Sequence, residues 1–131
     1  MRYLLDTSVL LWSVEDESKL SKRGRELLSS ADSEVYLSSA SSWEIAIKYA
    51  LGTLPLHIAP AVFIPEVMQG MALRPLEINH IHAVEAGRLP LHHRDPFDRM
   101  LIAQAQVEGM VLLTGDRVFQ KYEVDQVFCG K

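Results

Sequence analysis

Short hydrophobic runs alternate along this chain with longer segments in which hydrophobic residues recur at helical spacing. The hydrophobic runs predict β-strands at residues 2–5, 34–37, 73–78 and 110–114, with a short last strand around Val127. The helical pattern covers residues 7–14, 41–51, 60–68, 80–88 and 96–108. A further helix follows the polar segment after residue 14, with Leu20, Leu27 and Leu28 facing inward. Strands that alternate with helices predict an α/β fold with a mostly parallel sheet.

Several residues indicate where these helices begin and end. Gly52 and Gly109 follow two of the helices directly, in the position that glycine favours at a helix C-terminus. Pro60 suits a first helical turn, and Asn79 is a good N-cap for the helix that runs to about Arg88. Residues 89–95 are expected to form a loop, and residues 114–125 a turn and loop.

The length and composition fit one globular domain over residues 1–131, since 48% of the residues are hydrophobic and can form a core. The single cysteine, Cys129, cannot form an internal disulfide, which agrees with a cytoplasmic protein, and we expect it to be a packing residue. No stretch approaches the roughly 20 apolar residues that span a bilayer, so no membrane association is expected. Asp6 interrupts the first apolar run, which argues against a signal peptide.

Four acidic residues occupy comparable places in the predicted fold. Asp6 follows the first strand, Asp116 follows the strand at 110–114, and Glu44 and Asp98 lie in what we expect to be the first turns of helices. The carboxyl ends of parallel strands and the starts of the following helices share one edge of a sheet, where ligands bind. We expect carboxylates gathered there to lie within about 4–8 Å of one another. Their mutual repulsion would raise the pKa of some of them unless a cation such as Mg²⁺ or Mn²⁺ compensated their negative charge. A cation held there can activate a water molecule and neutralise charge on a phosphate.

Each acid also has a structural explanation of its own. Asp6 is a possible N-cap, and Asp116 follows a glycine in ordinary turn chemistry. Ser41 and Glu44 have the spacing of a capping box, in which the two side chains bond to each other's backbone N–H. Taken singly the residues leave this choice open, whereas their shared position at one edge favours a site.

Asp95 and Asp98 compete for the cap of the helix at residues 96–108. Asp95 precedes Pro96, which suits the first helical position, so we assign Asp95 to the cap and Asp98 to the metal site. The helix beyond Asp98 is almost wholly apolar and should be buried, which makes an acid at its start a good site candidate.

The formal net charge of −4 excludes a protein that binds nucleic acid by bulk electrostatics alone. It does not exclude an acidic protein that acts on nucleic acid through bound cations, so charge leaves this choice open.

Four segments of the chain resemble the motif regions of the PIN-domain family, and more narrowly of VapC-type toxins from toxin–antitoxin pairs. They are LLDTSVLLW, SSASSWEIAIK, DPFDRMLIAQA and LLTGDRVF, and their order and spacing match over nearly the whole chain. The resemblance implies a three-layer α/β/α sandwich around a central, mostly parallel sheet. It also implies that Asp6, Glu44, Asp98 and Asp116 form an acidic quartet that binds one or two Mg²⁺ or Mn²⁺ ions, with Asp6 and Asp98 as the most direct ligands.

The same resemblance implies an activity and partners. The reaction would be endonucleolytic hydrolysis of RNA phosphodiester bonds by a metal-activated water. The partners would be an RNA substrate, a VapB-type antitoxin whose tail enters the acidic site, and a second copy of the chain in a homodimer. The identity of the RNA depends on loop shape around the site and does not follow from the motifs.

Other polar residues near the acids are candidates for supporting roles. Thr114 could hydrogen-bond a carboxylate or a metal-bound water, and Thr7 is a second candidate of this kind. The cations that could contact RNA phosphates, or equally form salt bridges with nearby acids, are Arg94, Arg99, Arg117 and Lys121. Lys48 follows Glu44 by four residues and should be its partner on the helix surface.

The histidines have simple structural explanations. His92 and His93 lack metal-ligand spacing and are expected to be polar loop residues, and His80 and His82 are expected on a helix surface.

Trp12 and Trp43 are expected in the core or at a dimer contact rather than as base-stacking platforms. The apolar stretch at residues 51–67 fits either a dimer face or core packing.

Two other functions remain as alternatives. A haloacid-dehalogenase-like phosphatase also places an aspartate after the first strand, but needs a second aspartate two residues later, where this chain has Ser8. A PIN-fold scaffold or RNA-binding adaptor without activity is the second alternative. Four mutually repelling acids argue against it, and metal-dependent RNA cleavage separates the two.

Overall fold

The computed structural model describes all 131 residues and contains a five-stranded sheet in which every neighbouring pair of strands is parallel. The strand order is β3-β2-β1-β4-β5. The strands are β1 (Arg2–Leu5), β2 (Glu34–Ser38), β3 (Arg74–Leu76), β4 (Val111–Thr114) and β5 (Gln126–Phe128). The predicted α/β fold is therefore confirmed, with a sheet that is wholly rather than mostly parallel.

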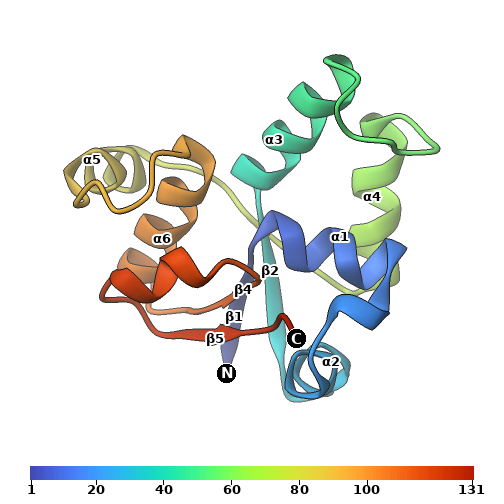
Figure 1. Cartoon of the computed structure of the whole chain (residues 1–131), viewed down its shortest axis with the longest axis horizontal. Coiled ribbons are helices and arrows are strands. Elements are labelled where there is room, and N and C mark those ends of the chain that lie inside the picture. The colour runs from blue at the N-terminus through green and yellow to red at the C-terminus, as the bar shows by residue number, and fades with distance from the viewer.

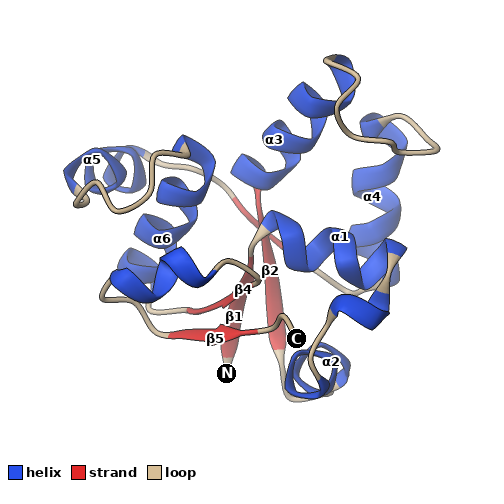
Figure 2. Cartoon of the chain, viewed as in Figure 1, coloured by secondary structure: helices blue, strands red, loops and turns tan.

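Helices cover both faces of this sheet, as Figures 1 and 2 show. One side carries α1 (Thr7–Glu15), α2 (Lys22–Ser29), α3 (Ser39–Ala50) and α4 (Pro60–Gly70). The other side carries α5 (His80–Arg88) and α6 (Pro96–Glu108). Two short 3-10 helices, η1 (Glu17–Lys19) and η2 (Arg117–Lys121), complete the chain. None of the helices combines the length and apolar character that crossing a membrane requires.

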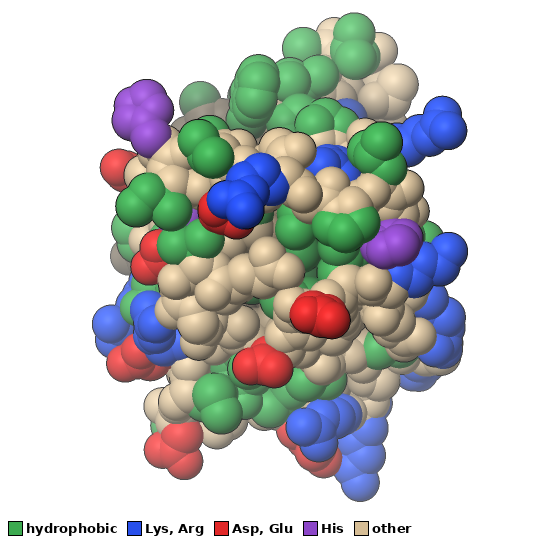
Figure 3. All heavy atoms as spheres, turned by 90° about the vertical axis from the view of Figure 1, so that its left-hand side faces the viewer, with side chains coloured by type: hydrophobic (Ala, Val, Ile, Leu, Met, Phe, Trp, Pro, Cys, Tyr) green, Lys and Arg blue, Asp and Glu red, His purple; other side chains and the backbone are tan.

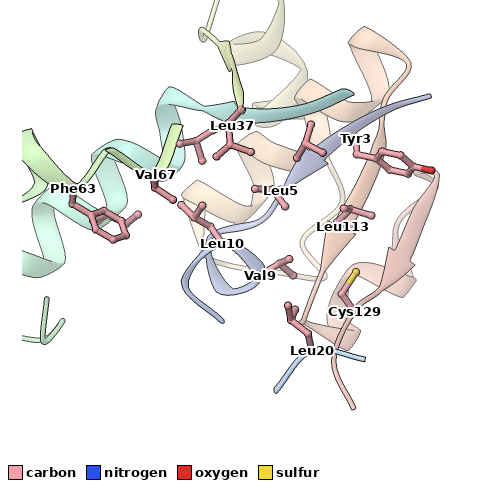
Figure 4. Close-up of a cluster of buried hydrophobic side chains, with 13 residues drawn as sticks. Tyr3, Leu5, Val9, Leu10, Leu20, Leu37, Phe63, Val67, Leu113 and Cys129 are labelled. Carbon is pink, nitrogen blue, oxygen red and sulfur yellow. The ribbon is translucent and has the colours of Figure 1, made fainter. Parts of the chain in front are cut away.

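The core is divided by the sheet into two clusters of buried side chains. In the larger cluster, Leu5 of β1 and Leu113 of β4 point toward Val9 and Leu10 of α1, with Cys129 at the margin (Figure 4). The smaller cluster packs α6 against the opposite face of the sheet. Cys129 is fully buried, as expected of a packing residue, and its burial raises the pKa of its thiol to about 11.

The order of the strands determines where a site can form. The chain winds from β1 to β2 to β3 on one side of β1, then crosses over to place β4 and β5 on the other side. The connections after β1 and after β4 therefore diverge to opposite faces of the sheet, and this leaves a crevice at the carboxyl ends of these two strands. Asp6 directly follows β1, and Asp116 lies two residues beyond the end of β4.

The element boundaries agree with the sequence pattern at most places and differ at three. The helix at residues 96–108 has the predicted bounds, with Asp95 as N-cap and Gly109 following it in the left-handed conformation. Strand β3 is shorter than the predicted 73–78, and the region expected to be only turn and loop contains η2. Helix α3 begins at Ser39 rather than at residue 41.

The early start of α3 makes the predicted Ser41–Glu44 capping box wrong. Strand β2 runs directly into the helix, and Ser38 is the N-cap, with its Oγ accepting a hydrogen bond from Ala40 N at 3.0 Å. Glu44 therefore lies in the second turn of α3, where no orphan backbone N–H competes for its side chain.

Candidate metal centre

Asp6 is held in the crevice between β1 and β4 by hydrogen bonds to both of its carboxylate oxygens. Its side chain is 2% exposed. Oδ1 accepts from Val9 N at 2.7 Å and so caps α1, while Oδ2 accepts from Thr114 Oγ1 at 2.6 Å and from Gly115 N at 2.9 Å. The capping role suggested by the sequence is thus real, and the same carboxylate also links the start of α1 to the turn after β4.

Burial raises the pKa of Asp6 above its ordinary value, and the negative charge of Asp116 adds to the rise. The donors from Thr114, Val9 and Gly115 oppose it by favouring the charged form. Of the two hydrogen bonds expected of Thr114, the one to a carboxylate is present, and its supporting role stays a prediction.

Glu44 is also buried, at 4% exposure, and each of its carboxylate oxygens has a polar partner. Its Oε1 accepts a hydrogen bond from Thr7 Oγ1 at 2.7 Å, and Thr7 Oγ1 also lies 3.0 Å from Ser41 Oγ. Its Oε2 pairs with Lys48 Nζ at 2.6 Å, as the four-residue spacing predicted, and this pairing raises the pKa of Lys48. Thr7 follows Asp6 in the chain, so the two buried acids are connected through adjacent residues.

Asp98 lies in the first turn of α6 with its carboxylate in a crowded negative environment. Burial first, and then the charges of Asp95, Glu44, Asp6 and Asp116, raise its pKa to about 8. The expectation of raised pKa values is confirmed for Asp6 and Asp98, but its main cause is burial, and repulsion between the acids comes second.

His93 lies between two of the site acids, and this contradicts its assignment as an ordinary polar loop residue. Its Nε2 is 3.0 Å from Asp98 Oδ2 and 2.9 Å from Asp116 Oδ2. The ligand atoms of these three residues all lie within 4.8 Å of one another. The hydrogen bond from Asp95 N to His93 Nδ1, at 3.2 Å, leaves the proton of the neutral ring on Nε2, where it can bridge the two carboxylates.

The loop that carries His93 is fixed by Arg99 and by Tyr122. The Arg99 guanidinium donates hydrogen bonds to four backbone carbonyls, at Ala86, Leu89, Pro90 and His93. Tyr122 Oη accepts from His93 N at 2.8 Å and donates to Pro90 O at 2.7 Å. Arg99 therefore supports the loop of the site and forms none of the salt bridges of the structure.

The remaining cations do not form the salt bridges with acids that the sequence left open. Arg94 and Lys121 are exposed, and the Arg117 guanidinium lies 4.0 Å from the centroid of the Phe128 ring. Asp116 accepts a hydrogen bond from Val118 N at 2.9 Å and so caps η2. Asp116, like Asp6, combines a capping oxygen with a place in the acidic crevice.

Two further assignments are changed by the structure. His82 is 1% exposed rather than on a helix surface, because its Nδ1 accepts from Asn79 N and its Nε2 contacts Glu108 Oε2 at 2.8 Å. Trp43 is 61% exposed and so is not a core residue, whereas Trp12 packs against the larger core cluster.

The residues around Asp98 fit a hard divalent cation. Carboxylate oxygens are the ligands that Mg²⁺ and Mn²⁺ prefer, and an imidazole is compatible with Mn²⁺. Burial and the charges of four neighbouring acids both disfavour the charged form of Asp98, and a cation bound there would favour it.

Comparison with known proteins agrees with this geometry. The PIN-domain family profile matches residues 3–125 of the chain. The chain belongs to the PIN-domain family. This membership removes the haloacid-dehalogenase-like alternative and confirms the fold that the four sequence segments implied.

The PIN domain is similar to one curated relative over part of its length and to several solved structures over nearly all of it. It is 38% identical over 58 residues to ribonuclease VapC16 of Mycobacterium tuberculosis, which is 44% of this chain and 41% of that protein. The chain thus spans about two fifths of that relative.

Among solved structures, it superposes with a TM-score of 0.74 on a chain of VapBC2 from Rickettsia felis bound to a promoter DNA fragment, at 14% identity and covering 98% and 99% of the two chains. A chain of DNA-bound VapBC from Salmonella typhimurium gives a TM-score of 0.69 at 19% identity, covering 98% of each chain. FitAcB from Neisseria gonorrhoeae gives 0.65 at 20% identity, covering 95% of each.

Proposed function

We propose that this PIN domain is a Mg²⁺- or Mn²⁺-dependent endoribonuclease, and that it is the toxin of a toxin–antitoxin pair. The observation that carries the proposal is the crevice itself, in which Asp98 is surrounded by Asp6, Glu44, Asp95 and Asp116, and its carboxylate lies with that of Asp116 against His93. The similarity to a ribonuclease of the VapC type supports the choice of RNA as substrate.

In this proposal Asp98 and Asp116 would hold the cation most directly, since their carboxylate oxygens lie within 4.8 Å of each other and of His93 Nε2. The resemblance implied Asp6 and Asp98 instead, but both oxygens of Asp6 already accept hydrogen bonds. Asp6 and Glu44 complete the acidic quartet, either directly or through water. A divalent cation at this place supplies Lewis acidity, which lowers the pKa of a bound water and stabilises negative charge on the phosphate. Thr114 and Thr7 orient Asp6 and Glu44 by donating to their oxygens. His93 holds the Asp98 and Asp116 carboxylates together through its Nε2.

The activity is tested by incubating the purified protein with total cellular RNA and either Mg²⁺ or Mn²⁺. We expect cleavage that EDTA stops and that Asp98→Asn reduces by at least about a hundredfold, because ligand loss removes the charge that binds the ion. Asp95→Asn is the matched control, since asparagine also caps helices and Asp95 is bound to its own helix start. Cleavage that is insensitive to EDTA, or equal in the Asp98 variant, contradicts the proposed site.

Asp6→Asn is a less suitable test than Asp98→Asn. An asparagine amide at position 6 would place N–H groups against the donors of Thr114 and Gly115, so it would disturb the fold as well as the site.

The toxin role and the partners rest on the structural neighbours, several of which are toxin–antitoxin complexes. We expect induced expression of the chain to arrest growth, and co-expression of the product of the adjacent open reading frame to rescue it. We also expect a homodimer, which light scattering on the purified protein would show as twice the 14.8 kDa chain mass. Arrest without rescue would leave the nuclease intact but remove the toxin assignment.

A further inference from the structure

A pair of aromatic rings, one of them exposed, joins the two helices that supply Glu44 and Asp98. Trp43 of α3 and Phe97 of α6 pack edge to face, with ring centroids 5.3 Å apart and planes at 80°. Trp43 is nevertheless 61% exposed. A tryptophan that remains this exposed while its ring is fixed by a neighbour is available for a ligand.

Each of the two aromatic residues directly precedes one of the site acids in the chain. Trp43 directly precedes Glu44, and Phe97 directly precedes Asp98, so each aromatic Cα is about 3.8 Å from the Cα of a site acid. The edge-to-face contact between the two rings brings α3 and α6 together at these residues. The ring pair therefore lies at the rim of the acidic crevice, on the side of α3 and α6.

The charge of the protein indicates what such a pair is needed for. With a net charge of −4, the chain has little general attraction for phosphate. On the face that carries α5 and α6, acidic and basic side chains are mixed, and basic side chains gather mainly along one edge of the view (Figure 3). Stacking on an aromatic face would add a contact that does not depend on phosphate and that accepts any base.

We propose that Trp43, supported by Phe97, is a base-stacking subsite for the nucleotide that adjoins the cleaved phosphate of single-stranded RNA. This inference rests on the proposed nuclease function and adds a substrate contact to it. We take the occupant to be a nucleobase because the ring pair adjoins two acids of the proposed nuclease site; Leu51, 71% exposed and eight residues after Trp43, continues an apolar strip on that side of α3, so a protein occupant is an outcome that the test must distinguish. The next exposed aromatic residue on α3 is Tyr49, six residues further, about 9 Å along the axis and on another face.

The first experiment measures steady-state cleavage of a short single-stranded RNA by wild type and by Trp43→Ala. We expect KM to rise about ten- to a hundredfold with a smaller change in kcat, because stacking contributes binding of about that size per base. Trp43→Phe should retain most of the affinity. Tyr49→Ala, which removes an exposed aromatic residue from the same helix, should behave as wild type.

The second experiment removes the base instead of the ring. RNA with one abasic nucleotide beside the cleaved bond should bind the wild-type protein weakly, with the same affinity that Trp43→Ala has for intact RNA. Trp43→Ala should bind the abasic and the intact RNA equally. Equal KM values for wild type and Trp43→Ala, or an abasic penalty of the same size in both, would overturn the inference. It is also overturned if Trp43→Ala leaves cleavage unchanged and weakens only antitoxin binding.

A binding measurement separates this inference from the proposed function. In an Asp98→Asn background, where no cleavage is expected, RNA should quench tryptophan fluorescence, and Trp43→Phe should remove the quenching. Absence of cleavage in wild type together with this quenching contradicts the nuclease and supports the subsite. Cleavage in wild type without quenching contradicts the subsite alone.

Discussion

The crowded carboxylates should make the metal-free protein lose stability as pH rises, and Asp98→Asn should remove much of that loss. In the folded protein the pKa of Asp98 is raised from 3.8 to about 8, so the native state keeps a proton that the unfolded chain releases. Between these two pH values the native state binds more protons, and the free energy of unfolding must fall with increasing pH. The raised pKa of Asp6 acts in the same direction.

The size of the effect follows from the shift. One pKa unit corresponds to about 1.4 kcal/mol, so Asp98 alone accounts for at most about 4 kcal/mol between pH 5 and pH 8. The His93 Nε2 donor 3.0 Å away favours the charged carboxylate and reduces this figure. We therefore expect a loss of about 2 kcal/mol over this range, a substantial part of the stability of a domain of this size.

Urea unfolding in EDTA at pH 5, 6, 7 and 8 measures this directly, provided that the m-value stays constant. Asp98→Asn should give a flatter profile and be more stable than wild type at pH 8, although it gives up a favourable charge at the start of α6. Saturating Mn²⁺ should raise the stability of wild type most at pH 8, because an ion that binds only the native state stabilises it. A wild-type profile in EDTA that is flat, or parallel to that of Asp98→Asn, would refute the reasoning.

Three other substitutions test separate parts of the site. A Cβ at Gly115 would lie 2.4 Å from the Trp12 ring, so Gly115→Ala should lower stability by about 1–3 kcal/mol in thermal unfolding, and an unchanged Tm would contradict the close packing. Arg99→Lys loses most of the hydrogen bonds to the loop at residues 89–93, and faster amide exchange in that loop should accompany a loss of about 1–3 kcal/mol. His93→Ala removes the donor between Asp98 and Asp116 and should weaken Mn²⁺ binding in calorimetry by about tenfold; tighter binding would show that the histidine competes with the ion.

Most of the fold was predictable because the signals that determine it are local. The bounds of α6 follow from the Asp95–Pro96 start and from Gly109, and both act within a few residues of the helix ends. The edge that carries the acids follows from the parallel sheet, since any residue just after β1 or β4 must lie there. Local spacing misled at Ser41 and Glu44, where Ser38 caps the helix and Thr7 bonds to both residues.

The parts of the site that could not be predicted depend on contacts between distant residues. His93 reaches Asp116 across 23 positions, and no spacing motif announces such a pair. His82 is buried because Glu108, 26 positions away, accepts its ring contact. Trp43 follows apolar neighbours in a helix and was expected in the core or at a dimer contact, but it is 61% exposed and packs edge to face on Phe97 of another helix. In each case the partner, rather than the residue type, decides the role.

The double use of the Asp6 carboxylate has a consequence for genetics. One oxygen starts α1 and the other anchors the turn after β4, so a replacement without two carboxylate oxygens leaves at least one of these donors without its partner. Mutations at this codon should lower the amount of protein in the cell along with its activity. In a screen for cells that survive expression of the chain, variants altered at Asp6 should therefore be found mainly as degraded protein. Variants altered at Asp98 should be found as full-length, inactive protein.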